Sequence, residues 1–534
     1  MVLILIYWCI LFFFASLSGI AFQNCFGFTK KNTAFTLLYG VIYQTLFLSL
    51  CAFFYAINFE IFILNSLIQF LFLYLYSKEF IEFLTSISKL FSKRNLCIFA
   101  LFCSLTALKS AQLSTLFDNE SYYIQTIKWL NEYGFVKGVA NVHPFLGQFS
   151  FWHVMQSGFN FSFLAVNFND LNGFILIIGM YYFMEKNIQK KVNWSFFGII
   201  FIVFYYQFID APSPDLLILV ISSMVFYEYI ENTTDFKSMV LFVIFMIFIK
   251  LTIAPLLLIA LVYACKNKNC IFYFIGISVV FGTVWISKNI IITGYPLFPL
   301  TLFPTSFDWK MSETVLNKLA QQTIEAGYSE NLIKTLNLSL IDKLKMWFAL
   351  DGINFIFNRG ILLLFILMPF TKVFKSNFNF KILYAILVIH FSALLVTSPQ
   401  YRFFLPTFIL FSTLILSELS AYFKYNTKNN MALLSLSLIV FCLFFDLKTG
   451  FQQTGFNLKQ IIIPNSISLK NNTTFKKKQI DNFSFFDPEL KNLYQTADGN
   501  LPCVNEKLFY FYNYIPQQRT NYIKDGFYAK EVQK

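Results

Sequence analysis

Residues 1–22 read MVLILIYWCILFFFASLSGIAF and hold no charged side chain. A helix of about 20 apolar residues crosses a hydrocarbon core of about 30 Å. Backbone groups in lipid must bond within their own segment, so a helix is the form that such a stretch adopts. Because the stretch lacks a basic start and a small-residue cleavage site, it is predicted to be a retained membrane span and not a signal peptide.

Similar apolar stretches recur as far as Asp446, and the composition of the whole chain is also strongly apolar. Of its 534 residues, 57% are hydrophobic and 13% are charged, with a mean hydropathy of +0.60. Soluble proteins carry about 25% charged residues, so a soluble globule is excluded. We expect an all-α polytopic membrane protein with about fourteen transmembrane helices, near residues 1–22, 34–56, 60–77, 95–109, 168–184, 194–209, 214–230, 238–249, 252–265, 270–287, 353–370, 381–397, 403–423 and 431–446.

Lysine and arginine predict the orientation of these spans. They recur in alternate connections, near residues 30–31, 78–94, 186–191, 237, 266–268, 372–381 and 424–428. By the positive-inside rule these connections face the cytoplasm. The outer side then holds both termini and the long loops 110–167 and 288–352, and within the first loop the aromatic, amphipathic residues 141–167 are expected to lie along the interface. Because the net charge of +13 is spread over short loops, no nucleic-acid partner is expected.

The apolar pattern stops after Asp446. The residues that follow mix Lys, Asn and aromatic side chains, with short β-like runs at Ile461–Ile463 and Leu508–Tyr514. We therefore expect a small extracytoplasmic C-terminal domain of α/β or β-rich structure. The predicted units are N-terminal transmembrane helices over 1–94, a transmembrane core over 95–446 and the extracytoplasmic domain over 447–534.

Ionisable groups on the outer face are the functional candidates, because such groups are costly inside a bilayer. They share one membrane face although they come from separate connections. An enzyme that works where a lipid headgroup meets an extracytoplasmic acceptor needs such acid, base and cationic groups together. A solvated surface would also collect charges. The residues are Asp118, Glu120, His143, His153, Asp210, Asp215, Lys250, Lys288 and Arg402.

The first outer loop opens with LFDNESYY at residues 116–123, directly after a span. A carboxylate just outside the membrane can take a proton from a hydroxyl or coordinate a divalent metal. Asp118 and Glu120 share a side only in an extended loop. The alternative is that Asp118 caps a helix over 121–133. His143 and His153 fit no metal-ligand spacing, which favours packing or hydrogen bonding.

This loop, as an acidic motif that follows a span and precedes a Tyr/Trp-bearing helix, resembles the GT-C superfamily of polyprenyl-phosphate-sugar glycosyltransferases. The resemblance is to bacterial members of unassigned substrate in particular, and it covers residues 95–425. Further matches follow in order on the same face: APSPD at 211–215, FIKLT at 248–252, KNIIITGYPLFP at 288–299 and SPQYRFFLP at 398–406.

The resemblance implies an inverting glycosyltransferase with a GT-C-like core in the bacterial inner membrane. It would move a sugar from a polyprenyl-phosphate donor to an extracytoplasmic cell-surface glycan or lipid acceptor. Asp118 would act as catalytic base or hold a divalent Mg or Mn ion, with Glu120 beside it. Lys250, Lys288 and Arg402 would meet the donor phosphate, where cations stabilise a leaving group. Further outer-face candidates are His143, Asp210, Asp215 and Tyr295.

Other interpretations remain open for the same residues. Lys250 is also placed to snorkel from a helix end toward the headgroups, and Arg402 to anchor its span at the interface. At the level of the whole chain, a transporter or flippase for lipid-linked saccharide is the first alternative, although transporters bind near the midplane and show repeated halves. A noncatalytic membrane scaffold is the second.

Overall fold

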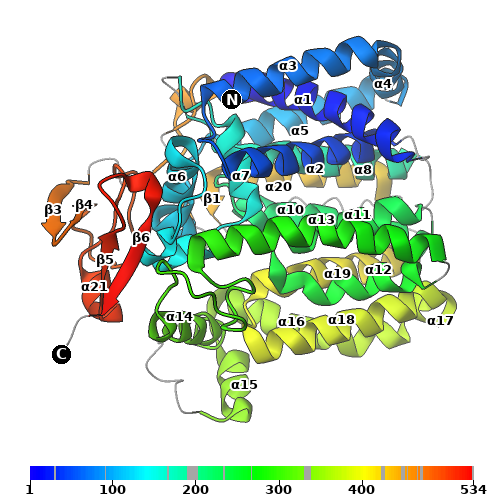
Figure 1. Cartoon of the computed structure of the whole chain (residues 1–534). Helices are drawn as coiled ribbons and strands as arrows, with labels where there is room; N and C mark the ends of the chain where they lie inside the picture. Colours follow the sequence, from blue (N-terminus) through cyan, green and yellow to red (C-terminus); the bar gives the residue numbers. More distant parts are fainter. Residues whose placement is uncertain are drawn as a thin grey trace.

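The molecule is a bundle of long helices with shorter elements gathered at one end (Figure 1). The computed structural model describes residues 1–28, 32–90, 92–164, 167–188, 203–232, 235–265, 268–329, 338–422, 427–446, 452–453, 455–465, 467–468 and 473–531. The bundle helices are α1 (Val2–Phe26), α2 (Thr33–Ala52), α3 (Phe59–Leu75), α4 (Ser77–Leu90), α5 (Lys93–Ser110), α8 (Leu171–Ile188), α10 (Pro214–Glu231), α11 (Phe236–Ile249), α12 (Leu257–Ala264), α13 (Lys268–Thr293), α16 (Gly352–Leu367), α17 (Lys372–Ser376), α18 (Phe378–Thr397), α19 (Tyr401–Tyr422) and α20 (Thr427–Phe444).

Six helices in the described part of the chain are long and apolar enough to cross a membrane, as in a multi-pass membrane protein. They are α1, α2, α18, α19, Asn269–Thr293 within α13, and Gly352–Phe370 across α16. Helices α3 and α4, bent by 88°, form a seventh if they are one broken span. Every predicted span coincides with a helix except 194–209, most of which lies outside the described residues. The count of fourteen crossings stays a prediction.

Helices α1 and α2 touch through their backbones at two glycines. A Cβ at Gly19 would lie 1.9 Å from the carbonyl oxygen of Thr36, and one at Gly40 would lie 1.7 Å from that of Ala15. Ala15 and Gly19 are four residues apart on α1, as Thr36 and Gly40 are on α2. Small residues at this spacing let membrane helices approach closely and pack without a hydrophobic driving force.

A ring of buried amide and hydroxyl groups joins α1, α2 and α3. Ser18 Oγ donates to Gln69 Oε1 at 2.9 Å, and Gln44 Nε2 donates to Ser18 Oγ at 2.6 Å. Asn65 closes the ring, because its Nδ2 donates to Gln44 at 2.7 Å and its Oδ1 accepts from Gln69 at 3.0 Å. Each side chain satisfies its neighbour, which removes the cost of burying these polar groups.

The two long loops and the C-terminal tail meet at one end of the bundle (Figure 1). The loops carry η1 (Asn119–Tyr123), α6 (Ile124–Tyr133), η2 (Val139–Asn141), η3 (Pro144–Gln148), α7 (Phe151–Phe159), α14 (Glu313–Glu325) and α15 (Leu340–Ala349). Gly138 N donates to Ile291 O at 2.7 Å, and Phe527 N donates to Lys137 O at 2.9 Å. Gly138 has a φ of 62°, and a Cβ there would lie 2.2 Å from Phe527 O. Only glycine fits this junction.

Helix α7 corrects the expectation that residues 141–167 lie along the interface. Trp152, Val154 and Phe159 are each 0% exposed. The indole Nε1 of Trp152 donates to Asn172 Oδ1 on α8 at 2.8 Å. Its aromatic side chains therefore fill the interior of the bundle end instead of covering the headgroups.

The C-terminal region is small and β-rich, as predicted. Its strands form three antiparallel pairs in the described residues: β1 (Phe445–Asp446) with β2 (Gln452–Gln453), β3 (Lys476–Ile480) with β4 (Phe483–Asp487), and β5 (Tyr514–Gln518) with β6 (Phe527–Glu531). Phe483, Phe485, Phe509 and Phe527 are at most 1% exposed and pack edge to face or stacked. These rings form the core of the region.

Neither predicted β-like run is a strand over its length. Residues 508–512 belong to helix α21 (Lys507–Tyr512), because Leu508, Phe509 and Tyr512 are buried at helical spacing. The helix ends at Asn513, which has a φ of 57°, and β5 begins at the next residue. Ile461 ends the short 3₁₀ helix η8 (Leu458–Ile461).

Cysteine reporters test the predicted orientation, in a background where the nine native cysteines are replaced. Helix α15 and the tail lie at one end of the bundle, and α4 and α17 lie at the other (Figure 1). Cysteines at the exposed positions Lys345 and Lys491 should react with an impermeant reagent on intact cells. Cysteines at the exposed positions Glu82 and Lys375 should react only after permeabilisation. The reverse pattern would invert the topology, and reaction at all four positions would contradict a membrane between the two ends.

Candidate functional site

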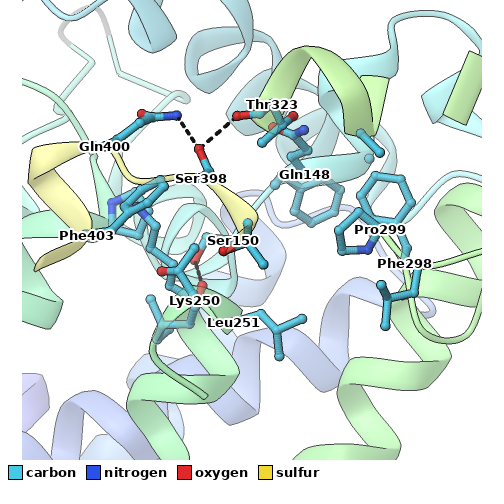
Figure 2. Close-up of a pocket in the computed structure, with 18 of the residues that line it drawn as sticks. Gln148, Ser150, Lys250, Leu251, Phe298, Pro299, Thr323, Ser398, Gln400 and Phe403 are labelled. Atoms are coloured by element: carbon cyan, nitrogen blue, oxygen red, sulfur yellow. Dashed lines mark hydrogen bonds between the residues drawn. The ribbon is translucent and has the colours of Figure 1, made fainter. Parts of the chain in front are cut away.

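A cavity of about 530 Å³ opens where α13 and α18 end and α19 begins. Figure 2 shows Lys250, Gln400 and Phe403 on one side of it, with Phe298 and Pro299 on the other. Helix α14 supplies a further wall, held by Ser398 Oγ, which donates to Thr323 O at 2.8 Å. Four of the five residues predicted for catalysis or phosphate binding line this cavity: Asp118, Lys250, Lys288 and Arg402.

Asp118 and Arg402 form an ion pair across the cavity wall. Arg402 Nη1 donates to Asp118 Oδ2 at 2.7 Å, and the two side chains are 26% and 20% exposed. The hydroxyl of Tyr123 also donates to Asp118 Oδ2, at 3.4 Å. The side chain of Asp118 caps no helix; it precedes a short π-helical turn, a form that is frequent at functional sites. The capping interpretation is therefore wrong.

Asp215 bridges Lys250 and Arg402. Its Oδ1 accepts from Lys250 Nζ, and its Oδ2 lies 3.6 Å from Arg402 Nη1. The Asp215 side chain is 3% exposed and sits at the start of α10, directly after Pro214 at the first helical position. Proline is pre-organised for that position, so Asp215 is held rigidly at the helix start.

Lys250 lies at the break between α11 and η5 (Leu251–Leu256). Its ammonium is 4.4 Å from the ring centre of Phe403, in addition to its contact with Asp215. The side chain is 17% exposed. Lys250 is therefore directed into the site and not outward to the headgroups, as a snorkelling lysine would be.

Lys288 lines the cavity from the last turns of α13. It is 4% exposed, its Nζ donates to Phe149 O at 3.1 Å, and the ring centres of Phe149 and Phe151 lie 5.0 and 5.1 Å away. Carbonyl and ring faces attract a cation but do not neutralise it. Lys250, Lys288 and Arg402 thus place three basic side chains in the cavity lining, where Asp118 is the one carboxylate among the described residues. A lining of this charge suits an anion.

Glu120 differs from its prediction, because it is buried away from the cavity lining. It is 2% exposed, and its Oε2 accepts from Ser468 Oγ at 2.8 Å. Its backbone oxygen accepts from Thr496 N at 2.9 Å. Asp118 and Glu120 lie around a helical turn, which sends their side chains in different directions. Glu120 holds the C-terminal tail.

Asp210 and Tyr295 also lie outside the cavity lining. Asp210 Oδ2 is 3.4 Å from Lys109 Nζ in a separate buried pair. The hydroxyl of Tyr295 donates to Met311 O at 3.2 Å, and its backbone N donates to Thr293 Oγ1 at 3.1 Å. Both contacts stabilise the bundle end.

His143 and His153 are buried and take part in hydrogen bonds, as expected for structural histidines. His143 Nε2 is 3.1 Å from Tyr494 O in the tail, and its Nδ1 accepts from Phe145 N at 3.2 Å. Burial lowers the pKa of His143 from 6.5 to about 4, so it is neutral near pH 7. His153 Nδ1 accepts from Ser150 N at 3.2 Å, and burial lowers the pKa of His153 to about 3.

Several site residues had no role in the sequence-based prediction. Gln400 accepts from Arg402 Nε at 2.9 Å, and Tyr123 contacts Asp118. Both lie inside the motifs LFDNESYY and SPQYRFFLP, within five residues of Asp118 or Arg402 in the sequence, and this closeness could have identified them. Leu319 and Thr323 of α14 also line the cavity, and no charge or motif marks them.

The described residues do not fit a divalent metal as they are arranged. Such ions take several oxygen ligands, and the described residues contain no group of three or more His, Cys, Asp or Glu side chains able to hold one. Asp118 and Asp215 each contact a cation instead.

These features define a helical membrane protein with a charged cavity at one end of its bundle. The chain belongs to the family described as "Domain of unknown function (DUF8201)", whose model matches residues 1–409. The match includes every charged residue of the cavity cluster. No curated protein and no solved structure matches the chain.

The lowered pKa of His143 predicts an acid-dependent loss of stability where His143 is buried. The unfolded histidine takes up a proton near pH 6.5 and the folded one near pH 4. The stability present above pH 6.5 is therefore lost as the pH falls toward 4, by at most ~3 kcal/mol. Hydrogen exchange around Phe145, whose N–H donates to His143 Nδ1, corrected for its intrinsic pH dependence, should lose protection over this window in the wild type and less so in His143→Gln. Equal losses in both proteins would assign the effect to other groups.

Proposed function

We propose that this protein is a membrane glycosyltransferase of GT-C type, with about fourteen spans and its cavity on the extracytoplasmic face of the bacterial inner membrane. It transfers a sugar, with inversion, from a polyprenyl-phosphate donor to a cell-surface glycan or lipid acceptor. The observation that carries the proposal is the convergence of Asp118, Lys250, Lys288 and Arg402 on one cavity. These residues come from four separate segments of the chain.

The chemistry of a single displacement fits this set of side chains. The acceptor hydroxyl oxygen bonds to the anomeric carbon of the sugar, and its proton passes to the Asp118 carboxylate. The bond from that carbon to the phosphate oxygen breaks, and its electron pair stays on the phosphate. Arg402, Lys250 and Lys288 stabilise the charge that develops there. Attack opposite to the leaving group inverts the anomeric configuration.

The apolar part of the cavity supports a lipid-linked donor. Trp285, Ile324 and Leu394 line it next to the charged cluster. Leu251 and Leu300 also line it and are 40% and 53% exposed. Exposed leucines beside the three cations suit a molecule with a hydrocarbon tail and a phosphate head, because each part meets matching surface.

The position of the cavity bears on the transporter alternative. Lys288 is in the last turns of α13, Thr397 ends α18, and Arg402 is in the first turn of α19. Transporters bind near the bilayer midplane in broken helices, whereas this cavity lies at helix ends. The break at Lys250 is the one feature of the cavity that a transporter would share.

Substitution of Asp118 tests the catalytic role. Asp118→Asn keeps the size of the side chain but is a far weaker base. Turnover by purified protein, with a panel of polyprenyl-phosphate sugars, should fall by ~10²-fold or more, as on removal of a general base. Unchanged turnover would remove Asp118 from the mechanism.

Arg402 provides the matched test of donor recognition. Arg402→Ala should raise the KM for the donor, and Arg402→Lys should recover only part of the loss because the bidentate fork is gone. If the wild-type protein moves a lipid-linked saccharide across a vesicle membrane but turns over no donor, the result favours a flippase. Neither transport nor turnover with any donor would favour a scaffold.

A further inference from the structure

Arg402 contacts protein groups through Nη1 and Nε in this structure. Nη1 lies 2.7 Å from Asp118 Oδ2 and 3.6 Å from Asp215 Oδ2, and Nε donates to Gln400 Oε1 at 2.9 Å. An anion that binds the guanidinium through Nη1 must therefore compete with a carboxylate. The proposed base is itself one of the competitors.

The two carboxylates on Arg402 are not equivalent. Asp118 lines the cavity and its side chain is 20% exposed, whereas that of Asp215 is 3% exposed. Asp215 also holds Lys250, so its departure would leave a second cation without its partner. Asp118 pairs with Arg402 at 2.7 Å. Displacement of Asp118 exposes its carboxylate to the cavity, while displacement of Asp215 would bury an unpaired charge, which is costly.

We propose that Arg402 exchanges partners, so that a phosphate anion in the cavity takes the place of Asp118 on the guanidinium while Asp215 stays as the fixed counter-ion. This inference rests on the proposed function and adds an order of events, in which the donor binds before Asp118 acts as the base. Asp118 is thus an internal ligand of Arg402 and leaves the guanidinium only when the phosphate binds. A carboxylate released from an ion pair is a better proton acceptor. The base is therefore active only after the donor has arrived.

The exchange predicts that loss of the base improves donor binding. Equilibrium binding of radiolabelled farnesyl phosphate to the purified full-length chain in detergent, at fixed ionic strength, measures it directly. Asp118→Asn removes the competing charge, and its dissociation constant should fall about tenfold, a change equivalent to ~1.4 kcal/mol. Asp118→Ala should behave in the same way, which keeps the test valid if one variant folds poorly. Unchanged or weaker binding in a folded Asp118 variant would overturn the exchange.

A matched control is available at the same end of the molecule. Asp308 Oδ2 accepts from Arg519 Nε at 2.7 Å, but Asp308 is 55% exposed and does not line the cavity. Asp308→Asn removes the same charge from the same kind of pair and should leave farnesyl phosphate binding as in the wild type. A tightening equal to that of Asp118→Asn would show a general charge effect and contradict the exchange.

A double-mutant cycle localises the competition to one contact. Arg402→Ala should weaken farnesyl phosphate binding, and Asp118→Asn should give no improvement in that background, because the competition needs the guanidinium. Inorganic phosphate should show the same gain on Asp118→Asn with a weaker affinity, whereas farnesol should show none. Equal affinities for the two phosphates would assign the site to free phosphate and not to a lipid headgroup, with the exchange intact.

The binding and turnover experiments distinguish failure of the partner exchange from failure of the proposed transferase activity. If no sugar donor is turned over but Asp118→Asn still tightens phosphate binding through Arg402, the transferase assignment fails and the exchange stands. If turnover depends on Asp118 but its substitution leaves phosphate binding unchanged, the transferase stands and the exchange fails.

Discussion

The site depends on the need to pair charges at the edge of a hydrocarbon layer. An isolated charge there is costly, and a buried pair is stable only when its geometry is good. Arg402 from α19 and Lys250 from a helix break meet Asp118 from a loop and Asp215 from the start of α10. These contacts join four separate segments of the chain. The cavity exists where they meet, and the network supplies the charges that line it.

The helices could be predicted from the sequence because lipid permits few alternatives. Apolar length located the long helices of the bundle that the structure describes, and the orientation indicated by the lysines stays a prediction. Contacts that depend on one partner could not be foreseen. Gly19 and Gly40 give no sign that they face each other, and Leu508 to Tyr512 reads equally as strand or helix when so few residues are considered. Such short apolar runs are ambiguous by periodicity alone, and Asn513 ends the helix through its backbone conformation.

The charged members of the site were predicted better than the residues that support them. A lysine or arginine at a span edge stands out because it is rare, so Lys250, Lys288 and Arg402 were found. Glu120 stands out for the same reason, yet its partners are Ser468 and the backbone of Thr496 in the tail, which no local pattern indicates. The walls formed by α14 are apolar or neutral, and a residue of this kind is recognised only when the chain has folded.

The central claim is that the cavity receives a lipid-linked phosphate between its cations. A cryo-electron microscopy map of the full chain in lipid nanodiscs, saturated with farnesyl phosphate, tests it most directly. The account predicts density for the phosphate against Arg402, Lys250 or Lys288, with the prenyl chain along the apolar wall that holds Trp285. It also predicts that Asp118 has left Arg402. A phosphate bound elsewhere, or a cavity that stays empty under saturation, would contradict it.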